Sequence, residues 1–323
     1  MKKLMNLAIA SGLFTEGFHS DYKAVEAYLK QHDLDGIEMI LYGDYLVADI
    51  PKPLIVGHHL LYWPNWMDFW HKDHEALLKD FLSVDNIKAY YGFHEPEHML
   101  AYYEAEFESA KTVEAEYMVY HVSNTSFEDI FTYQHKYDSK SVMTASIELI
   151  NQVFVGDGPM LLFENLMWPG LTYTDYELTK WFFEQITYEN KGLLLDVAHL
   201  MATSSEITTE EQGIAYVHQI LDDMGELTKH IKTIHLNKTI AGPYLMEEHT
   251  DRHKSFMATT DMMERYGMIY QHISKIDSHM PFDHPGIMSI INRVQPDYLV
   301  YELTAKNLDE LSDRIQLQND YIK

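Results

Sequence analysis

Short apolar runs that end in a histidine or an acidic residue recur along this chain and restrict its fold more than any other feature. Seven of them, read in order, are LIVGHH, YMVYH, LLFEN, GLLLDVAH, IKTIH, KIDSH and YLVYE. An apolar run of this length is typical of a strand buried in a parallel sheet, and the polar residue lies where the strand leaves the core. When such strands close into a barrel, their carboxyl ends share one rim, where active sites are built.

Strand candidates alternate with segments of helical periodicity, which is the pattern of a (β/α)8 barrel. We expect strands near residues 4–10, 36–42, 54–59, 117–122, 160–165, 191–197, 231–236 and 297–303. Helical periodicity covers 21–32, 66–82, 97–112, 126–153, 173–188, 207–228 and 285–294. The sequence therefore predicts an α/β fold, a TIM barrel that occupies residues 1–323 as one domain.

Two connections are longer than a simple barrel needs. Residues 60–116, after the third expected strand, are rich in Trp, Tyr and His and predict two helices rather than one. Residues 239–276 lengthen the connection after the seventh strand. Long loops on the catalytic rim often form lids. We therefore expect insertions after strands 3 and 7.

The amino-acid composition restricts the classes of molecule that the chain is expected to bind. The 24 Lys and Arg residues against 50 Asp and Glu residues give a net charge of −26. Because duplex DNA is bound largely through Lys and Arg, this excess disfavours DNA and favours a small-molecule substrate. The chain has no Cys, which excludes thiolate metal sites and fits a reducing compartment. The start lacks a full signal-peptide pattern, and no run reaches membrane-span length, so we expect a cytoplasmic protein.

The polar strand ends are imidazoles and carboxylates, the donors that divalent metals use when thiolates are absent. Asp196 and His199 form an Asp-x-x-His pair, while Glu164, His235 and Glu302 end other strands. Glu164, Asp196, His235 and Glu302 would hold one ion. The further donors, which are His58, His121, His199 and an Asp-x-His pair, favour two or three ions of Zn, Mn or Fe.

Two choices among these donors stay open. Side-chain alternation sends only one of His58 and His59 inward, and the position within IVGHH favours His58. The Asp-x-His pair is either Asp251 with His253 or Asp277 with His279. We favour the second pair, because the residues around 251 look like part of a mobile or helical insertion.

The runs LLFEN, LLLDVAH and IHLN resemble the Glu-Asn, Asp-x-x-His and His-Leu-Asn elements of the endonuclease IV and xylose isomerase-like TIM barrels. The resemblance covers roughly residues 4 to 305 outside the two insertions. In endonuclease IV-type proteins nine matching positions bind three metal ions. The resemblance thus implies metal-binding roles for His58, His121, Glu164, Asp196, His199, His235, Asp277, His279 and Glu302. Asp251-Arg252-His253 matches the family's Asp-Arg-His literally, and the acidic charge departs from the phosphate-binding face of DNA repair enzymes.

Several reactions are compatible with this donor set. Two or three ions favour metal-activated water acting on a phosphoester or other small substrate, with Glu164 as bridging ligand or base. One ion would favour a sugar or sugar phosphate isomerase or epimerase, in which Glu164 and Glu302 exchange a proton and His199 and Lys238 hold sugar oxygens. A likeness to multinuclear iron oxidases of this barrel type and a non-enzymatic metal-binding barrel are further alternatives. Lys238 and Arg252 are the cations nearest the rim, and Lys238 is the candidate substrate-binding residue.

Overall fold

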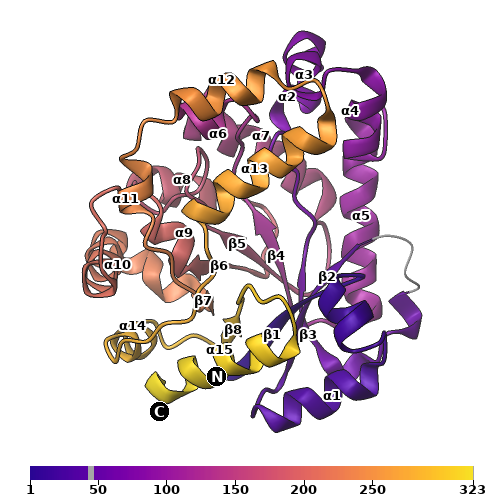
Figure 1. Ribbon diagram of the computed structural model, residues 1–323. Coiled ribbons are helices and arrows are strands. Elements are labelled where there is room, and N and C mark those ends of the chain that lie inside the picture. The colour runs from indigo at the N-terminus through magenta and orange to yellow at the C-terminus, as the bar shows by residue number, and fades with distance from the viewer. Residues whose placement is uncertain (43–46, 323) are drawn as a thin grey trace.

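Eight parallel strands form a closed barrel in the computed structural model, which describes residues 1–42 and 47–322 (Figure 1). Each strand pairs with its neighbour in sequence, and β8 closes the barrel by pairing with β1. The strands are β1 (Lys2–Ile9), β2 (Gly36–Leu41), β3 (Ile55–His59), β4 (Tyr117–His121), β5 (Met160–Glu164), β6 (Lys191–Asp196), β7 (Ile231–His235) and β8 (Tyr298–Tyr301). The predicted (β/α)8 TIM barrel is confirmed.

Helices surround the strands (Figure 1). They are α1 (Tyr22–Gln31), α2 (Met67–Trp70), α3 (His74–Phe81), α4 (Val84–Tyr91), α5 (Glu97–Thr112), α6 (Asp129–Thr132), α7 (Ser139–Val153), α8 (Tyr176–Gln185), α9 (Val197–Met201), α10 (Glu210–Met224), α11 (Gly242–Leu245), α12 (Thr250–Ala258), α13 (Met262–Ile276), α14 (Ile287–Val294) and α15 (Leu308–Tyr321). Many begin at a capping side chain that accepts a backbone N–H, as Asp138 does for α7 and Asn307 for α15. Among the described residues, no helix has both the length and the apolar character needed to cross a membrane.

The helices depart from the sequence expectation in the long connections. Residues 60–116 contain four helices, α2 to α5, instead of two. The expected helix over 66–82 is broken because Lys72 adopts a left-handed conformation and Asp73 then caps α3. Leu82 is also left-handed, and Ser83 caps α4. The stretch 126–153 likewise divides into α6 and α7, and the C-terminal helix α15 was not expected.

The core has an inner and an outer part. The inner part fills the barrel with side chains from several strands, and its buried members are Leu4, Val56, Tyr117, Val119, Leu162, Leu194 and Val300. The outer part lies between the strands and the surrounding helices and contains most of the other buried apolar residues. Because the inner layer plugs the barrel, a polar site can form only above it, at the carboxyl ends of the strands.

Candidate metal centre

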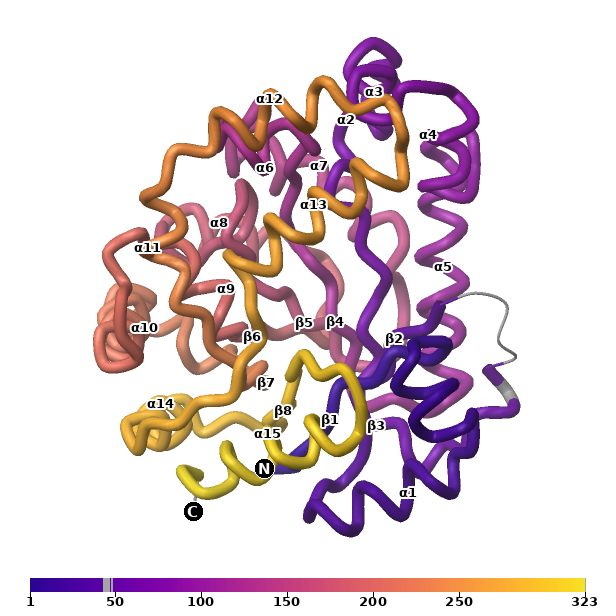
Figure 2. Tube along the Cα trace, viewed as in Figure 1, coloured from indigo at the N-terminus to yellow at the C-terminus, as the bar shows by residue number. Residues whose placement is uncertain are grey.

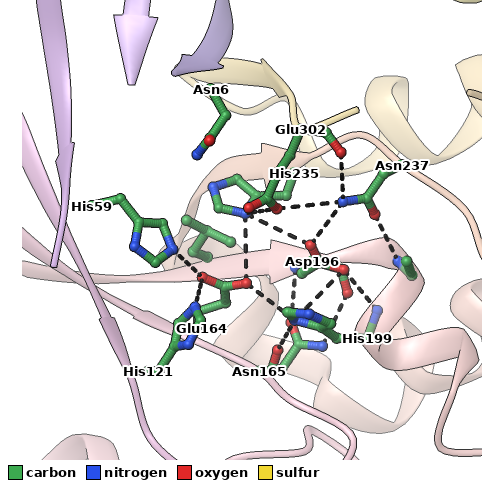
Figure 3. Close-up of polar contacts among 12 residues, drawn as sticks. Asn6, His59, His121, Glu164, Asn165, Asp196, His199, His235, Asn237 and Glu302 are labelled. Carbon is green, nitrogen blue, oxygen red and sulfur yellow. Dashed lines mark hydrogen bonds and ion pairs between the residues drawn. The ribbon is translucent and has the colours of Figure 1, made fainter. Parts of the chain in front are cut away.

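Adjacent strands bring the polar residues to one level of the barrel. Glu164, Asp196 and His235 are the last residues of β5, β6 and β7. The strand register pairs His121 with Glu164 and Asp196 with His235. Glu302 follows β8 directly. Figure 3 shows that these side chains converge on a common centre at the carboxyl ends of the strands.

The histidine that β3 contributes to this centre is His59, and the expectation for His58 is corrected. The pairing of β2 with β3 steps from Ile37–Ile55 to Glu38–Gly57, so β3 carries one extra residue there. Gly57 then faces the interior, since a Cβ atom at this position would lie 2.4 Å from the Tyr117 ring. Two residues later His59 faces the centre, whereas the Nε2 atom of His58 lies 2.9 Å from Glu106 Oε2 of α5. The irregularity shifts the alternation on which the prediction depended.

The donors form three groups in which the candidate ligand atoms lie within 4.8 Å of one another. The His59 group contains His59, His121 and Glu164. The central group contains Glu164, Asp196, His235 and Glu302. The His199 group contains His199, Asp277 and His279. Eight of the nine residues expected from the sequence are therefore in these groups, and His59 takes the place of His58.

Glu164 belongs to two of the groups and faces them with different oxygens. Its Oε2 atom lies 2.9 Å from His121 Nε2 and 3.3 Å from His59 Nε2. Its Oε1 atom lies 3.5 Å from His235 Nδ1. The carboxylate is completely buried. One carboxylate that faces two sets of donors in this way has the geometry of a ligand that bridges two ions.

The second Asp-x-His pair is the one that reaches the centre. Asp277 Oδ2 lies 3.2 Å from His199 Nε2 and 2.8 Å from His279 Nε2. His253, in contrast, is on α12 and lies 3.2 Å from Glu128. Asp251 is fully exposed at the start of the same helix. The structure thus favours Asp277 and His279 as the metal-binding pair.

We predict that His279→Ala lowers the metal content by one equivalent, while His253→Ala leaves it unchanged. His279 supplies one of the three side chains of its group, and the loss of one donor of three weakens a site severely. Elemental analysis of both purified variants measures the difference. Equal metal content in the two variants would show that the pair is assigned incorrectly.

Several polar atoms of the centre are buried without a hydrogen bond of normal geometry. They are both carboxylate oxygens of Glu164, both ring nitrogens of His121, Nδ1 of His235 and Oδ1 of Asp277. Buried polar atoms are nearly always satisfied, and a cluster of exceptions needs an explanation such as an ion. The carboxylate and imidazole donors suit Zn, Mn or Fe. The residues present therefore fit a group of divalent metal ions.

Opposite charges alternate in the centre. Burial acts to raise the pKa of Glu164, but the neighbouring His121 and His235 hold it well below its usual range. Burial alone would lower the pKa of His279, yet the charges of Asp277 and Glu302 raise it to about 10. In the metal-free protein, protons on His199, His235 and His279, whose pKa values the carboxylates raise, balance part of the negative charge, whereas burial lowers the pKa of His121. Binding of metal ions must release these protons.

Two asparagines that had no assigned role hold the end of β6 in place. Asn165 forms two hydrogen bonds to the backbone of Asp196, at 3.0 and 2.9 Å. Asn237 donates to Asp196 Oδ2 at 3.1 Å and accepts from the backbone N–H of Ala198, also at 3.1 Å. Their position directly after Glu164 and two residues after His235 was the available sequence signal. Such partners fix the orientation of a ligand.

The two long connections, together with α6 from the connection after β4, meet at the barrel mouth and form a roof, which we define as α2–α4, α6, α12 and α13. β3 and β7 are four strands apart in a closed barrel of eight, so contacts between their connections must cross the mouth. Arg265 of α13 donates to the carbonyls of Lys79 and Asp80 at the end of α3. Tyr90 and Tyr266 stack with ring centroids 6.3 Å apart. Figure 2 shows α12 and α13 passing α6 to reach α3.

The cations expected at the rim are already paired. The ammonium of Lys238 contacts Glu210 and lies 2.8 Å from Asp283. Arg252 lies 3.0 Å from Glu247. The substrate-binding role of Lys238 therefore stays a prediction, and a substrate oxyanion would compete with two carboxylates for this side chain.

Solved structures show the same barrel. Endonuclease IV from Thermus thermophilus superposes with a TM-score of 0.57 at 14% identity, over 100% of this chain and 99% of that one. An L-ribulose 3-epimerase gives 0.52 at 12% identity, over 98% and 92%. A sugar phosphate isomerase/epimerase from Parabacteroides distasonis gives 0.51 at 11%, over 99% and 93%. The chain thus shares its barrel fold with endonuclease IV and with these sugar-converting enzymes.

These structural neighbours are enzymes: an endonuclease, an epimerase and an isomerase/epimerase. No family model matches the chain. No curated protein matches it either. Identities this low establish a shared fold. The reaction depends on the residues of the site, because one fold can support many different functions.

Proposed function

We propose that this protein is a metal-dependent hydrolase that cleaves a phosphoester in a small substrate. The observation that carries the proposal is the sharing of Glu164 between the His59 group and the central group. A buried carboxylate with one oxygen toward each group is suited to hold two cations close together. Adjacent divalent ions activate water and stabilise the leaving oxygen of a phosphoester.

The residues of the chain have distinct roles in this proposal. His59, His121 and the central group hold cations on both sides of Glu164, and the His199 group holds a third. Asn165 and Asn237 keep Asp196 in position. The roof lies over the mouth and limits access to it, while Glu164, Asp196 and His235 at the base of the site are completely buried.

A small substrate is favoured over duplex DNA by two independent observations. The roof spans the mouth through contacts such as those of Arg265 with the end of α3. The net charge of −26 repels a polyanion, and the cations expected at the rim are paired. A short phosphoester presents less charge and less bulk to this site.

The test uses the protein loaded with Zn²⁺ or Mn²⁺ and the chromogenic diester bis(4-nitrophenyl) phosphate. We expect release of nitrophenol that a chelator abolishes and that added metal restores. A duplex oligonucleotide with one abasic site, assayed in parallel, should remain uncleaved. If the fully metallated protein hydrolyses neither this diester nor the corresponding monoester, 4-nitrophenyl phosphate, the proposal is refuted.

A sugar isomerase or epimerase is the second candidate, and the composition of the central group favours it. That group contains two glutamates, Glu164 and Glu302, beside one aspartate and one histidine. Two carboxylates around a single ion could move a proton between the faces of a carbon next to a carbonyl. A panel of ketoses and ketose phosphates, with epimer formation followed by chromatography, distinguishes this activity from hydrolysis.

A further inference from the structure

The histidines of the centre differ in what holds the ring nitrogen that faces away from the ligand group. Three of them use Nδ1 to donate to a backbone carbonyl, which leaves Nε2 free for a cation. The pairs are His59 with Leu60 O at 2.9 Å, His199 with Asn165 O at 3.0 Å, and His279 with Glu302 O at 3.0 Å. For these rings the backbone itself selects the tautomer.

His121 and His235 differ from these three: the ring nitrogens of His121 make no hydrogen bond of normal geometry, whereas the outer partner of His235 is a carboxylate. Its Nε2 atom lies 3.1 Å from Glu38 of β2. Its Nδ1 atom therefore faces the central group, 2.9 Å from Glu302 Oε2 and 3.6 Å from Asp196 Oδ2. Both His235 and Glu38 are completely buried.

The Glu38 carboxylate is itself fixed by two donors. The side-chain amide of Asn6 donates to Oε1 at 2.9 Å, and the hydroxyl of Tyr117 donates to Oε2 at 2.8 Å. Figure 3 shows Asn6 beside His235 at the edge of the centre. Because Glu38 accepts from both neighbours, the third contact is an N–H donated by His235 Nε2. When metal binding releases the other ring proton, the lone pair of Nδ1 faces the central group.

We propose that Glu38 is a positioning residue that fixes His235 as an Nδ1 ligand and sets the affinity of the central group for its ion. The inference rests on the metal centre of the proposed function. A carboxylate that accepts the outer N–H makes an imidazole a more basic ligand than a carbonyl does, and its loss lowers metal affinity by about 10- to 100-fold. The four-donor group that contains Glu164 is thus also the group with the most strongly supported histidine.

The test measures Zn²⁺ affinity by competition with a chromophoric chelator. In Glu38→Gln, which keeps the size of the side chain, we expect one of the bound equivalents to be weakened by about 10- to 100-fold while the others keep their affinity. Glu106→Gln is the matched control, because Glu106 makes the same contact with His58 outside the centre. In zinc-loaded protein with ¹⁵N-labelled histidine, His235 should be a ring that keeps its proton on Nε2 and binds through Nδ1, and Glu38→Gln should change its signals while those of His58 stay unchanged.

Asn6→Ala provides a second variant in case Glu38→Gln does not fold. It removes only the amide that fixes Oε1, so we expect a smaller weakening of the same equivalent. Unchanged Zn²⁺ affinity in a folded Glu38→Gln or, failing that, in Asn6→Ala overturns the inference. Affinity is measured without substrate, so protein that binds Zn²⁺ as expected but hydrolyses nothing would refute the proposed function alone.

Discussion

Glu164→Gln is expected to reduce the metal content from three equivalents to at most one. Glu164 is the only residue common to the His59 group and the central group, and its two oxygens face different histidines. Glutamine has one neutral carbonyl oxygen in place of two anionic ones, so it cannot satisfy both groups. Only the His199 group, which does not include Glu164, keeps all of its donors.

The activity of this variant should fall together with its metal content. Metal ions contribute several kcal/mol of transition-state stabilisation, so loss of two of them lowers hydrolysis by about a thousandfold or more. Elemental analysis and the diester assay measure the two effects on one sample. Glu106→Gln, which alters a buried carboxylate outside the centre, should keep both metal and activity. A Glu164→Gln protein with three bound ions would show that Glu164 does not bridge.

Arg265→Ala is expected to destabilise the roof by about 3 kcal/mol, because several hydrogen bonds to buried groups are lost together. The side chain is only 2% exposed. Its Nε donates to Thr259 O at 2.8 Å, and its Nη1 donates to Lys79 O and Asp80 O at 3.0 and 2.9 Å. The guanidinium also lies 4.7 Å from the centroid of the Phe256 ring. Alanine would leave the carbonyls at the end of α3 without their donor.

Arg265→Ala should increase local opening of the roof as well as lower the stability of the whole protein. At about 1.4 kcal/mol for each factor of ten, amide exchange in α12 and α13 should accelerate by about a hundredfold where it proceeds through roof opening. Arg293→Ala is the control, since Arg293 makes its contacts with His218 and Asp222 at the surface. Surface pairs contribute about 0 to 1 kcal/mol. Equal urea midpoints and equal exchange in the two variants would contradict the role of Arg265 in joining the two halves of the roof.

The barrel and most of the centre could be predicted because local patterns specify them. Most of the eight strands are short apolar runs buried on both faces, and such runs can be recognised in a sequence. Glu164, Asp196 and His235 end three of these runs, so the closure of the sheet brings them together without further information. Asp277 and His279 could be preferred over the pair at 251 and 253 because the latter lies within a helical insertion.

The errors arose where a single residue or a distant contact decides the outcome. The extra residue in β3 that turns His59 inward is marked in the run LIVGHH only by Gly57, because a glycine inside a strand is a weak sign of a bulge. The ion pairs of Lys238 with Glu210 and Asp283, which are remote in sequence, could not be predicted either. The roof depends on contacts between α3 and α13 that are 185 and 186 residues apart. Hydrophobic periodicity predicts neither a single extra residue in a strand nor a contact between residues far apart in the sequence.

Metal stoichiometry tests the central claim most directly, namely that the barrel mouth holds three cation sites, two of which share Glu164. The protein is purified without chelator, equilibrated with excess Zn²⁺, separated from free metal and analysed for zinc per chain. We predict three equivalents for the wild-type protein, with the number falling to one or none in Glu164→Gln. A wild-type protein that binds one equivalent or none would contradict the multinuclear centre.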